Sequence, residues 1–255
     1  MSVVLKADSL TMRFGGLLAV DKFCMEVVPT DLIGIIGTNG AGKTTVFNML
    51  TGMYLPTEGR VSLLNEDVTD LSPYQITQRG MSRTFQNIRL FKDLSVIDNI
   101  RLAGHFRQSY GLVSSILRTP SFKREEERLI SEARELLKIF ALEKKESHLA
   151  RNLPYGEQRR LEMARALAIH PKVLLLDEPA AGMNPNETKE LTGLIRWVRD
   201  HFKIAIVLIE HDMALVMNVC ERIYVLDHGV EIAQGTPVQI QSNPAVIEAY
   251  LGAQT

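Results

Sequence analysis

The sequence predicts an α/β fold, with a parallel β-sheet core, an antiparallel β subdomain and an inserted helical subdomain. Short apolar runs alternate with helical segments on either side of the middle of the chain, as parallel strands joined by crossover helices do. Between them, residues from about 95 to 170 show helical periodicity. The first 28 residues alternate loosely between apolar and polar positions around Gly15-Gly16, which indicates antiparallel strands.

Each expected element has its own signal. The N-terminal alternation predicts two strands, and the run 32–37 (LIGIIG) ends in glycine, as a buried parallel strand would. After a Gly-rich turn, KTTVFNMLTG predicts a helix that stops at Gly52. Late in the chain, strands and helices alternate again. The strands are expected at 173–177 (VLLLD), 203–210 (KIAIVLIE) and 222–227 (RIYVLD), and the helices at 187–200 (ETKELTGLIRWVRD) and 213–220 (MALVMNVC).

The helical middle contains two clear segments. Residues 125–142 (EEERLISEARELLKIFAL) place apolar side chains on one face of a helix and charged side chains on the other. Residues 158–168 (QRRLEMARALA) predict a second helix. The apolar face of the first helix comprises Leu129, Ala133, Leu136, Leu137 and Phe140.

Composition excludes several classes of protein. The 255 residues are 45% hydrophobic and 23% charged, which is enough apolar material for one large domain. The formal net charge of −1 gives no general electrostatic reason to bind nucleic acid or an anionic membrane surface. The N-terminus lacks the charged start and apolar run of a signal peptide, and the longest uncharged stretch, 44–57, is too short to cross a bilayer. We expect a soluble chain that reaches a membrane only through a partner.

The two cysteines, Cys24 and Cys220, lie far apart and belong to no CxxC or Cys/His cluster. A metal site made from them is therefore not expected. Two lone cysteines are typical of buried thiols in a reducing compartment.

A phosphate-binding loop lies between the first parallel strand and the helix that follows it. Residues 37–44 fit the pattern GxxxxGK[ST] of P-loop NTPases. Glycines let backbone N–H groups surround phosphate oxygens, Lys43 can reach the β- and γ-phosphates, and the Thr44 hydroxyl can ligate Mg²⁺. The candidate ATP-binding residues here are Gly37, Thr38, Asn39, Gly40, Ala41, Gly42, Lys43, Thr44 and Thr45.

Two carboxylates follow the apolar strand 173–177. The tip of a parallel strand faces the ligand crevice, so Asp177 can hold Mg²⁺, directly or through water. Glu178 can then polarise a water molecule aimed at the γ-phosphorus.

Further motifs resemble the ABC ATPases, and the resemblance covers essentially the whole chain. The segment LPYGEQRR, before the acidic strand, resembles the LSGGQ signature of that family. The other matching features are Gln86 in RTFQ (the Q-loop), His211 in IEHD (the switch histidine), residues 180–185 (the D-loop) and Phe14, an aromatic ring placed to stack on adenine.

The resemblance implies a single ABC ATPase domain over residues 1–255, with a RecA-like P-loop NTPase fold. Residues 1–86 and 170–255 would form the catalytic core with its β subdomain, and residues 87–169 the inserted helical subdomain. It implies ATP and Mg²⁺ as cofactors. Glu178, His211 and Gln86 would be catalytic, with His211 on the γ-phosphate and Gln86 sensing Mg²⁺ and the attacking water.

In the family, two such subunits meet head to tail, and ATP on one phosphate loop is covered by the signature segment of the other. That segment would open a helix whose N-terminus faces the γ-phosphate. The signature residues acting in trans would be Leu153, Pro154, Tyr155, Gly156 and Glu157.

This sequence departs from the family pattern in the signature. Pro154 replaces the usual serine and Tyr155 the next glycine. A lost charge-assisted hydrogen bond costs about 1.5–3 kcal/mol, so the ATP site completed by this signature is expected to be weaker or slower. In the D-loop, Asn184 stands where aspartate is common.

Several stretches look most like the ATP-binding subunits of bacterial branched-chain amino acid importers. They are MRFGGLLAV, RTFQNIRLF, LPYGEQRRLEMARALA, AAGMNP, NPAVIEAYLG and the segment 105–123. This resemblance implies two transmembrane permease subunits, a second ATP-binding subunit or a homodimer, and an extracytoplasmic amino acid-binding protein. The chain would lie peripherally on the cytoplasmic face of a bacterial inner membrane. Urea, amide or lipopolysaccharide transport are the alternative roles, and 105–123 is either a surface elaboration or a partner contact.

Three other classes compete with this interpretation. A non-transport ABC ATPase of the DNA-repair or ribosome-associated kind would carry a long coiled coil or two phosphate loops, and this chain has one loop and no long heptad run. A small-molecule kinase leaves the signature and His211 unexplained. A binding module without turnover has no use for Glu178 or His211.

Overall fold

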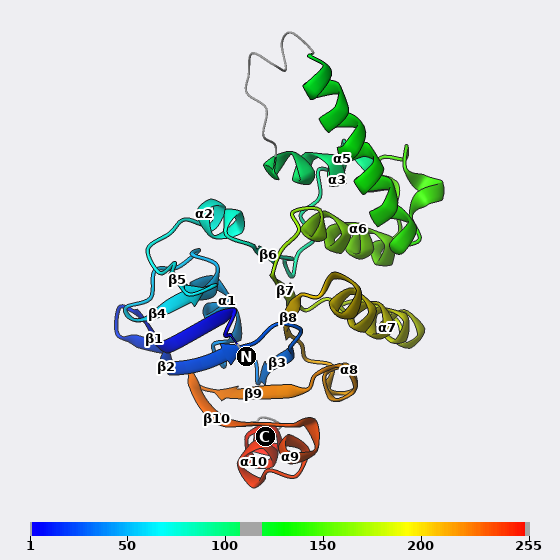
Figure 1. Cartoon of the computed structure of the whole chain (residues 1–255). Coiled ribbons are helices and arrows are strands. Elements are labelled where there is room, and N and C mark those ends of the chain that lie inside the picture. Colours follow the sequence, from blue (N-terminus) through cyan, green and yellow to red (C-terminus); the bar gives the residue numbers. More distant parts are fainter. Residues whose placement is uncertain (1, 108–118, 253–255) are drawn as a thin grey trace. The chain divides into compact units, whose positions relative to one another are not determined.

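The computed structural model describes residues 2–107 and 119–252 (Figure 1). The chain divides into two compact units, one of residues 1–86 and 172–255 and the other of residues 87–171. Over the described residues, no helix combines the length and apolar character needed to cross a bilayer.

The first unit is built around a six-stranded sheet in the order β10-β9-β3-β8-β7-β6 (Figure 1). The five strands from β9 to β6 are parallel, and β10 pairs antiparallel with β9. The expected parallel core is therefore confirmed. The strands are β3 (Leu32–Gly37), β6 (Met81–Arg83), β7 (Val173–Asp177), β8 (Ala205–Ile209), β9 (Arg222–Asp227) and β10 (Val230–Gly235).

A second, antiparallel sheet has the strand order β2-β1-β4-β5. The predicted N-terminal pair is present as β1 (Leu5–Phe14) and β2 (Leu17–Val27). The sequence patterns had not indicated β4 (Glu58–Leu63) and β5 (Glu66–Asp67), which complete this sheet.

The prediction of two buried thiols is half wrong. Cys220 is buried, whereas Cys24 is exposed. Its neighbours Phe23 and Met25 point into the core, so the alternation of a strand turns the Cys24 side chain outward. The backbone N–H of Ser9 donates to its Sγ at 3.3 Å.

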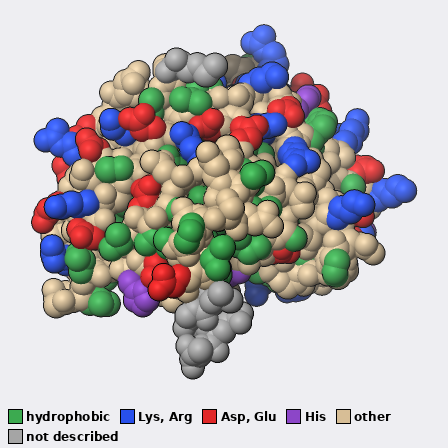
Figure 2. Space-filling view, turned by 90° about the horizontal axis from the view of Figure 1, so that it is seen from below, with side chains coloured by type: hydrophobic (Ala, Val, Ile, Leu, Met, Phe, Trp, Pro, Cys, Tyr) green, Lys and Arg blue, Asp and Glu red, His purple; other side chains and the backbone are tan. Residues whose placement is uncertain are grey.

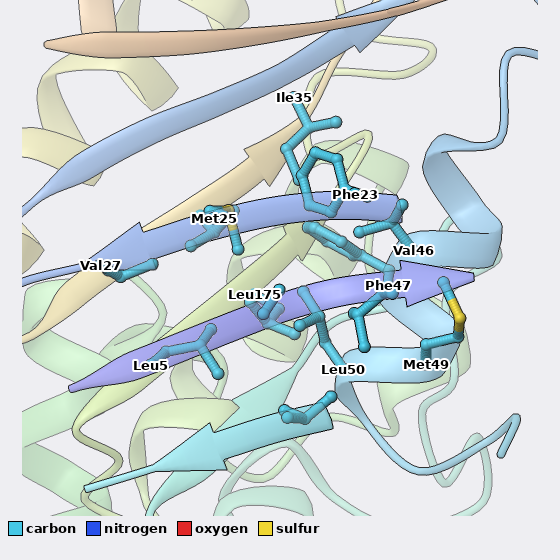
Figure 3. Close-up of a cluster of buried hydrophobic side chains, with 14 of the residues drawn as sticks. Leu5, Phe23, Met25, Val27, Ile35, Val46, Phe47, Met49, Leu50 and Leu175 are labelled. Carbon is cyan, nitrogen blue, oxygen red and sulfur yellow. The ribbon is translucent and has the colours of Figure 1, made fainter. Parts of the chain in front are cut away.

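The first unit has six helices within the described residues. Helix α1 follows the phosphate loop directly and ends at Leu50, two residues before the expected stop. Apolar side chains of α1, among them Phe47, join those of β1, β2 and β3 in one buried cluster (Figure 3). The helices are α1 (Lys43–Leu50), α2 (Pro73–Gln78), α7 (Pro185–Phe202), α8 (Met213–Val219), α9 (Pro237–Gln241) and α10 (Pro244–Gly252).

In the part of the second unit that the structure describes, all regular structure is helical. The predicted apolar face of the long helix is confirmed, because all five of its side chains are buried. Residues 108–118 of the segment 105–123 lie outside the described residues. The elements are α3 (Val96–Gly104), α5 (Pro120–Ile139), α6 (Tyr155–Leu167) and three 3₁₀ turns, His105–Arg107, Glu143–Lys145 and Ala150–Asn152.

Candidate functional site

The phosphate loop and the acidic strand end at the same edge of the parallel sheet. Ile35 of β3 pairs with Ile209 of β8, and Ile209 pairs with Asp177 of β7. Two strand spacings amount to about 10 Å, so the last residues of β3, β8 and β7 surround one region. Parallel strands place ligand sites at their carboxyl ends, and every candidate catalytic residue lies there.

Lys43 lies curled back on its own loop. Its Nζ donates to the carbonyl oxygens of Gly37 at 2.9 Å and Thr38 at 2.8 Å. Burial lowers the pKa of the Lys43 ammonium, and the nearby charges of Glu178 and Asp177 partly oppose this shift. Lys43 therefore shares one electrostatic environment with both carboxylates.

Two glycines of the loop cannot be replaced without strain. Gly37 has φ +154°, and an added Cβ would lie 2.1 Å from the carbonyl oxygen of Leu226. Gly42 has φ +99°, and its Cβ would lie 2.7 Å from the carbonyl oxygen of Ala19. The loop therefore adopts a backbone conformation that side chains rarely permit.

A cavity of about 390 Å³ opens beside the loop. Seven of the predicted ATP-binding residues line it together, namely Phe14, Gly40, Ala41, Gly42, Lys43, Thr44 and Thr45. Four residues that sequence reasoning did not single out complete the wall: Leu17, Leu18, Ala19 and His228. Asn39 is exposed at the turn before the cavity and is not among its lining residues.

Phe14 presents an exposed aromatic ring at the end of β1. The residue is 45% exposed, and its ring meets Tyr54 edge to face at a centroid distance of 5.4 Å. An exposed ring on a cavity wall, held from one side by a second ring, is suited to stacking against a planar base.

Asp177 is buried and paired with Arg83. The Arg83 Nη2 donates to Asp177 Oδ2 at 2.6 Å, while Nη1 of the same guanidinium donates to Asn48 and Thr51. The backbone N–H of Asp177 also donates to the Thr84 hydroxyl at 3.3 Å. The carboxylate of Asp177 is thus held by Arg83 of β6, and the guanidinium of Arg83 is in turn anchored at the C-terminal end of α1.

Glu178 brings the other two candidate catalytic residues together. Gln86 Nε2 donates to Glu178 Oε2 at 2.7 Å, and His211 Nε2 lies 2.5 Å from Glu178 Oε1. The Glu178 residue is only 9% exposed. A carboxylate held between an amide and an imidazole has a fixed orientation, which is one requirement for a general base.

The expected Mg²⁺ ligands have suitable chemistry. Thr44, Gln86 and Asp177 offer hydroxyl, amide and carboxylate oxygens, which are the donors this hard cation prefers. Among the described residues, no group of three or more His, Cys, Asp and Glu side chains gathers as a dedicated metal cage. A phosphate-bound Mg²⁺ needs only one or two carboxylates, so the donor set fits.

The signature segment opens helix α6 in the second unit. Pro154 is the N-cap and makes no side-chain capping hydrogen bond. Leu153 is buried, and Tyr155 is 45% exposed while its hydroxyl accepts from Arg159 at 2.9 Å. Gly156 lies in the first turn, and Glu157 accepts from Lys145 Nζ at 2.7 Å.

Sequence reasoning missed three polar residues around the site. Arg83 stands in the RTFQ run, three residues before Gln86, and Glu210 stands in IEHD, directly before His211, but neither belongs to a general motif. Tyr250 comes from the last helix; burial raises its pKa, and a hydrogen bond with the Gly37 backbone opposes that rise. A contact across more than two hundred residues leaves no local signal in the sequence.

Comparisons with known proteins agree on one family. The model of the ABC transporter family matches residues 20–181, and that of the C-terminal part of branched-chain amino acid ATP-binding cassette transporters matches residues 231–254. LivG of Escherichia coli (strain K12), a high-affinity branched-chain amino acid transport ATP-binding protein, is 49% identical over 249 residues, 98% of each chain. BraF of Pseudomonas aeruginosa, with the same description, is 45% identical over 98% of each chain.

Solved structures give the same result. The ADP conformation of MJ1267, an ATP-binding cassette of an ABC transporter, superposes with a TM-score of 0.85 at 30% identity, covering 99% of this chain and 100% of that one. By sequence alone, the lipopolysaccharide export ATP-binding protein LptB of Acidithiobacillus ferridurans is a more distant relative, 33% identical over 100% of this chain and 99% of its own.

Proposed function

The chain belongs to the ABC transporter family of ATP-binding proteins, and from that premise we propose the role of each residue in its site. It binds nucleotide and hydrolyses ATP. The arrangement of Glu178 between Gln86 and His211, at the sheet edge that also carries the phosphate loop, is the observation that carries the assignment.

The proposed chemistry begins with the phosphates. Backbone N–H groups of residues 37–44 and the N-terminus of α1 bind the β- and γ-phosphates, and Lys43 exchanges its two carbonyl acceptors for phosphate oxygens. Phe14 stacks on the adenine. Mg²⁺, held by Thr44, Asp177 and Gln86, would neutralise charge on the phosphate oxygens.

Hydrolysis needs a proton acceptor next to the attacking water. Glu178 polarises that water, and the carboxylate keeps its orientation through the amide of Gln86. His211 contacts the γ-phosphate in the proposed state, and in the structure its imidazole lies against the carboxylate of Glu178. The chain thus supplies a base, two groups that orient it and a phosphate cradle.

The transported solute is assigned from the relatives. The closely similar LivG and BraF are branched-chain amino acid transport ATP-binding proteins, and residues 231–254 match the C-terminal model specific to such transporters. The chain therefore powers uptake of leucine, isoleucine and valine. Lipopolysaccharide export is the second candidate, because LptB matches over the whole chain, although at 33% identity.

The working assembly has further members. Two transmembrane permease subunits would receive the conformational change that ATP binding and hydrolysis produce. A second ATP-binding subunit or a second copy of this chain would supply the facing signature segment. An extracytoplasmic amino acid-binding protein would deliver the solute. The chain would lie peripherally on the cytoplasmic face of the membrane. On the face drawn in Figure 2, acidic and basic side chains are interspersed, with no broad basic surface for nucleic acid.

Uptake in cells tests the solute. The gene for this chain is deleted from its bacterial host and then supplied again. Uptake of radiolabelled leucine is measured in both strains, with excess valine, isoleucine or urea as competitor. We expect uptake that valine and isoleucine suppress and urea does not. Unchanged leucine uptake with restored lipopolysaccharide export would transfer the assignment to the second candidate.

ATP turnover tests the residue roles. We expect Glu178→Gln to lower kcat by about 10²–10⁴-fold while nucleotide binding is retained, because only the base is lost. Lys43→Ala should instead weaken ATP binding. If Glu178→Gln turned over at the wild-type rate, Glu178 would not be the base.

A further inference from the structure

Glu210 is a buried carboxylate for which the proposed chemistry has no use. It directly follows β8, immediately before His211, and it is only 3% exposed. An ionised carboxylate in such a place requires several hydrogen-bond donors, since burial alone disfavours the charge.

Those donors come from the backbone of two different loops. Oε1 of Glu210 accepts from the N–H of Ala180 at 2.7 Å. Oε2 accepts from the N–H groups of His211 at 3.1 Å and Asp212 at 3.4 Å. Burial raises the pKa of Glu210, and the hydrogen bonds from these three N–H groups oppose that rise.

The backbone next to Glu178 makes this contact possible. Glu178 donates its N–H to the carbonyl of Ile209 at 2.9 Å, so the two chain segments continue side by side beyond the sheet. Glu178 then adopts φ +46°, a left-handed conformation that costs a residue other than glycine about 1–2 kcal/mol. The turn directs the N–H of Ala180 toward Glu210.

We propose that Glu210 is a positioning residue that ties the loop after Glu178 to the loop that carries His211. Each carboxylate oxygen holds one loop, so the side chain fixes the spacing between the two. That spacing keeps the imidazole of His211 against the carboxylate of Glu178. The proposal rests on the roles proposed above for Glu178 and His211.

The test uses Glu210→Gln, which preserves shape but not the pair of acceptors. Glutamine has one oxygen and an NH₂ group, so one of the two loops loses its acceptor and meets a donor instead. Glu231→Gln is the matched control, because Glu231 is a half-buried acid on β10 whose pKa burial also raises.

The first measurement is amide hydrogen exchange in segments 178–183 and 211–216, with the chain alone. For Glu210→Gln we expect exchange in at least one of these segments to become about tenfold faster, with β1 and β2 unchanged. Glu231→Gln should change neither segment. Unaltered exchange in both segments of Glu210→Gln overturns the proposal.

The second measurement is ATP turnover of the chain purified with its partner subunits. We expect Glu210→Gln to lower kcat about tenfold with the KM for ATP within about twofold of wild type, since the phosphate cradle is untouched. In a His211→Ala background the same change should have little further effect, because residues that act through one another are not additive.

Two outcomes distinguish the failures. An equal loss of kcat with and without His211 shows that Glu210 does not act through it, and this overturns the proposal. Full turnover by His211→Ala alone overturns the role proposed for His211, and the tie between the loops is then decided by the exchange measurement.

Discussion

Asp177 and Glu178 are sequence neighbours, yet the structure gives their carboxylates different partners. Asp177 is paired with the guanidinium of Arg83, which fixes the position of its carboxylate. Glu178 is held instead by the amide of Gln86 and the imidazole of His211, one on each carboxylate oxygen. The division suits one acid for holding a cation and the other for proton transfer.

The buried pair of Asp177 and Arg83 makes a testable contribution to stability. The side chains are 4% and 7% exposed, and removing one partner of such a pair typically costs about 3–5 kcal/mol. We expect Arg83→Met to lower the urea midpoint accordingly, followed by the fluorescence of Trp197, the single tryptophan.

The control for this pair is Arg79→Met. Arg79 pairs with Glu66 at the surface, with side chains 36% and 66% exposed, and such pairs contribute about 0–1 kcal/mol. Equal effects of the two substitutions would mean that the Asp177 pair is solvated.

The two thiols should differ in reactivity. Cys24 is exposed, whereas Cys220 is buried beside Gly34, and burial raises the pKa of the Cys220 thiol. The thiolate is the reactive form, so at pH 8 we expect an aromatic disulfide reagent to modify one thiol in the native chain and both in denaturant. Rapid modification of both native thiols would contradict the structure.

At the scale of elements, two of the loops named above lead into helices that differ at their N-termini: α7 has a side-chain cap and α6 has none. Asn184 caps α7 by accepting from the N–H groups of Asn186 and Glu187, each at 3.0 Å, while Glu187 accepts from the N–H of Asn184 at 2.9 Å. Helix α6 begins at the signature with no side-chain cap at Pro154. The uncapped N–H groups of α6 are the ones proposed to face the γ-phosphate.

The contribution of the α7 cap to the free energy of unfolding can be measured by substitution. We expect Asn184→Ala to cost about 1 kcal/mol in the free energy of unfolding, because one or two backbone donors lose their acceptor. Asn184→Asp, which restores the commoner D-loop residue, also caps and should be close to neutral. Thermal unfolding of both variants, measured side by side, checks this; a larger loss for Asp than for Ala would refute it.

The missing cap of α6 predicts the reverse effect. Pro154→Ser should stabilise the chain by about 1 kcal/mol, because serine is a good N-cap and proline offers no side-chain acceptor. ATP binding to the isolated chain should be unchanged, since the signature is proposed to act on the nucleotide of the facing subunit. A large loss of ATP binding would show that the segment has another role.

At the scale of the whole molecule, periodicity and motif spacing were sufficient for the long helices and for four strands of the parallel sheet, β3, β7, β8 and β9, whereas the short strand β6 was not predicted. Strands such as β7 consist of an apolar run that ends in a recognisable acidic residue, so the sequence left only their exact first and last residues undetermined. The short strands β4 and β5 lack such a pattern. The exposure of Cys24 was not predictable either. It depends on which face of β2 the side chain occupies, and the loose alternation of apolar and polar residues in that strand does not fix the face.

The site was predictable only where a motif names the residue. The phosphate loop, Gln86, Glu178 and His211 each carry a recognised local pattern. Arg83 and Glu210 depend on partners brought near by the fold, such as Asp177, 94 positions from Arg83, and Ala180, 30 positions from Glu210. Pairings of that kind are set by sheet topology, which single residues do not encode.

The order of strands in the parallel sheet has a consequence for biosynthesis. Strand β3, which leads into the phosphate loop, lies between β8 and β9, so both of its neighbours come from residues 205–227. A ribosome adds about 5–20 residues per second, and the strand must therefore wait unpaired for roughly ten seconds or more while the rest is translated. During translation the nascent chain carries an apolar strand with two open edges, which is a natural target for a chaperone.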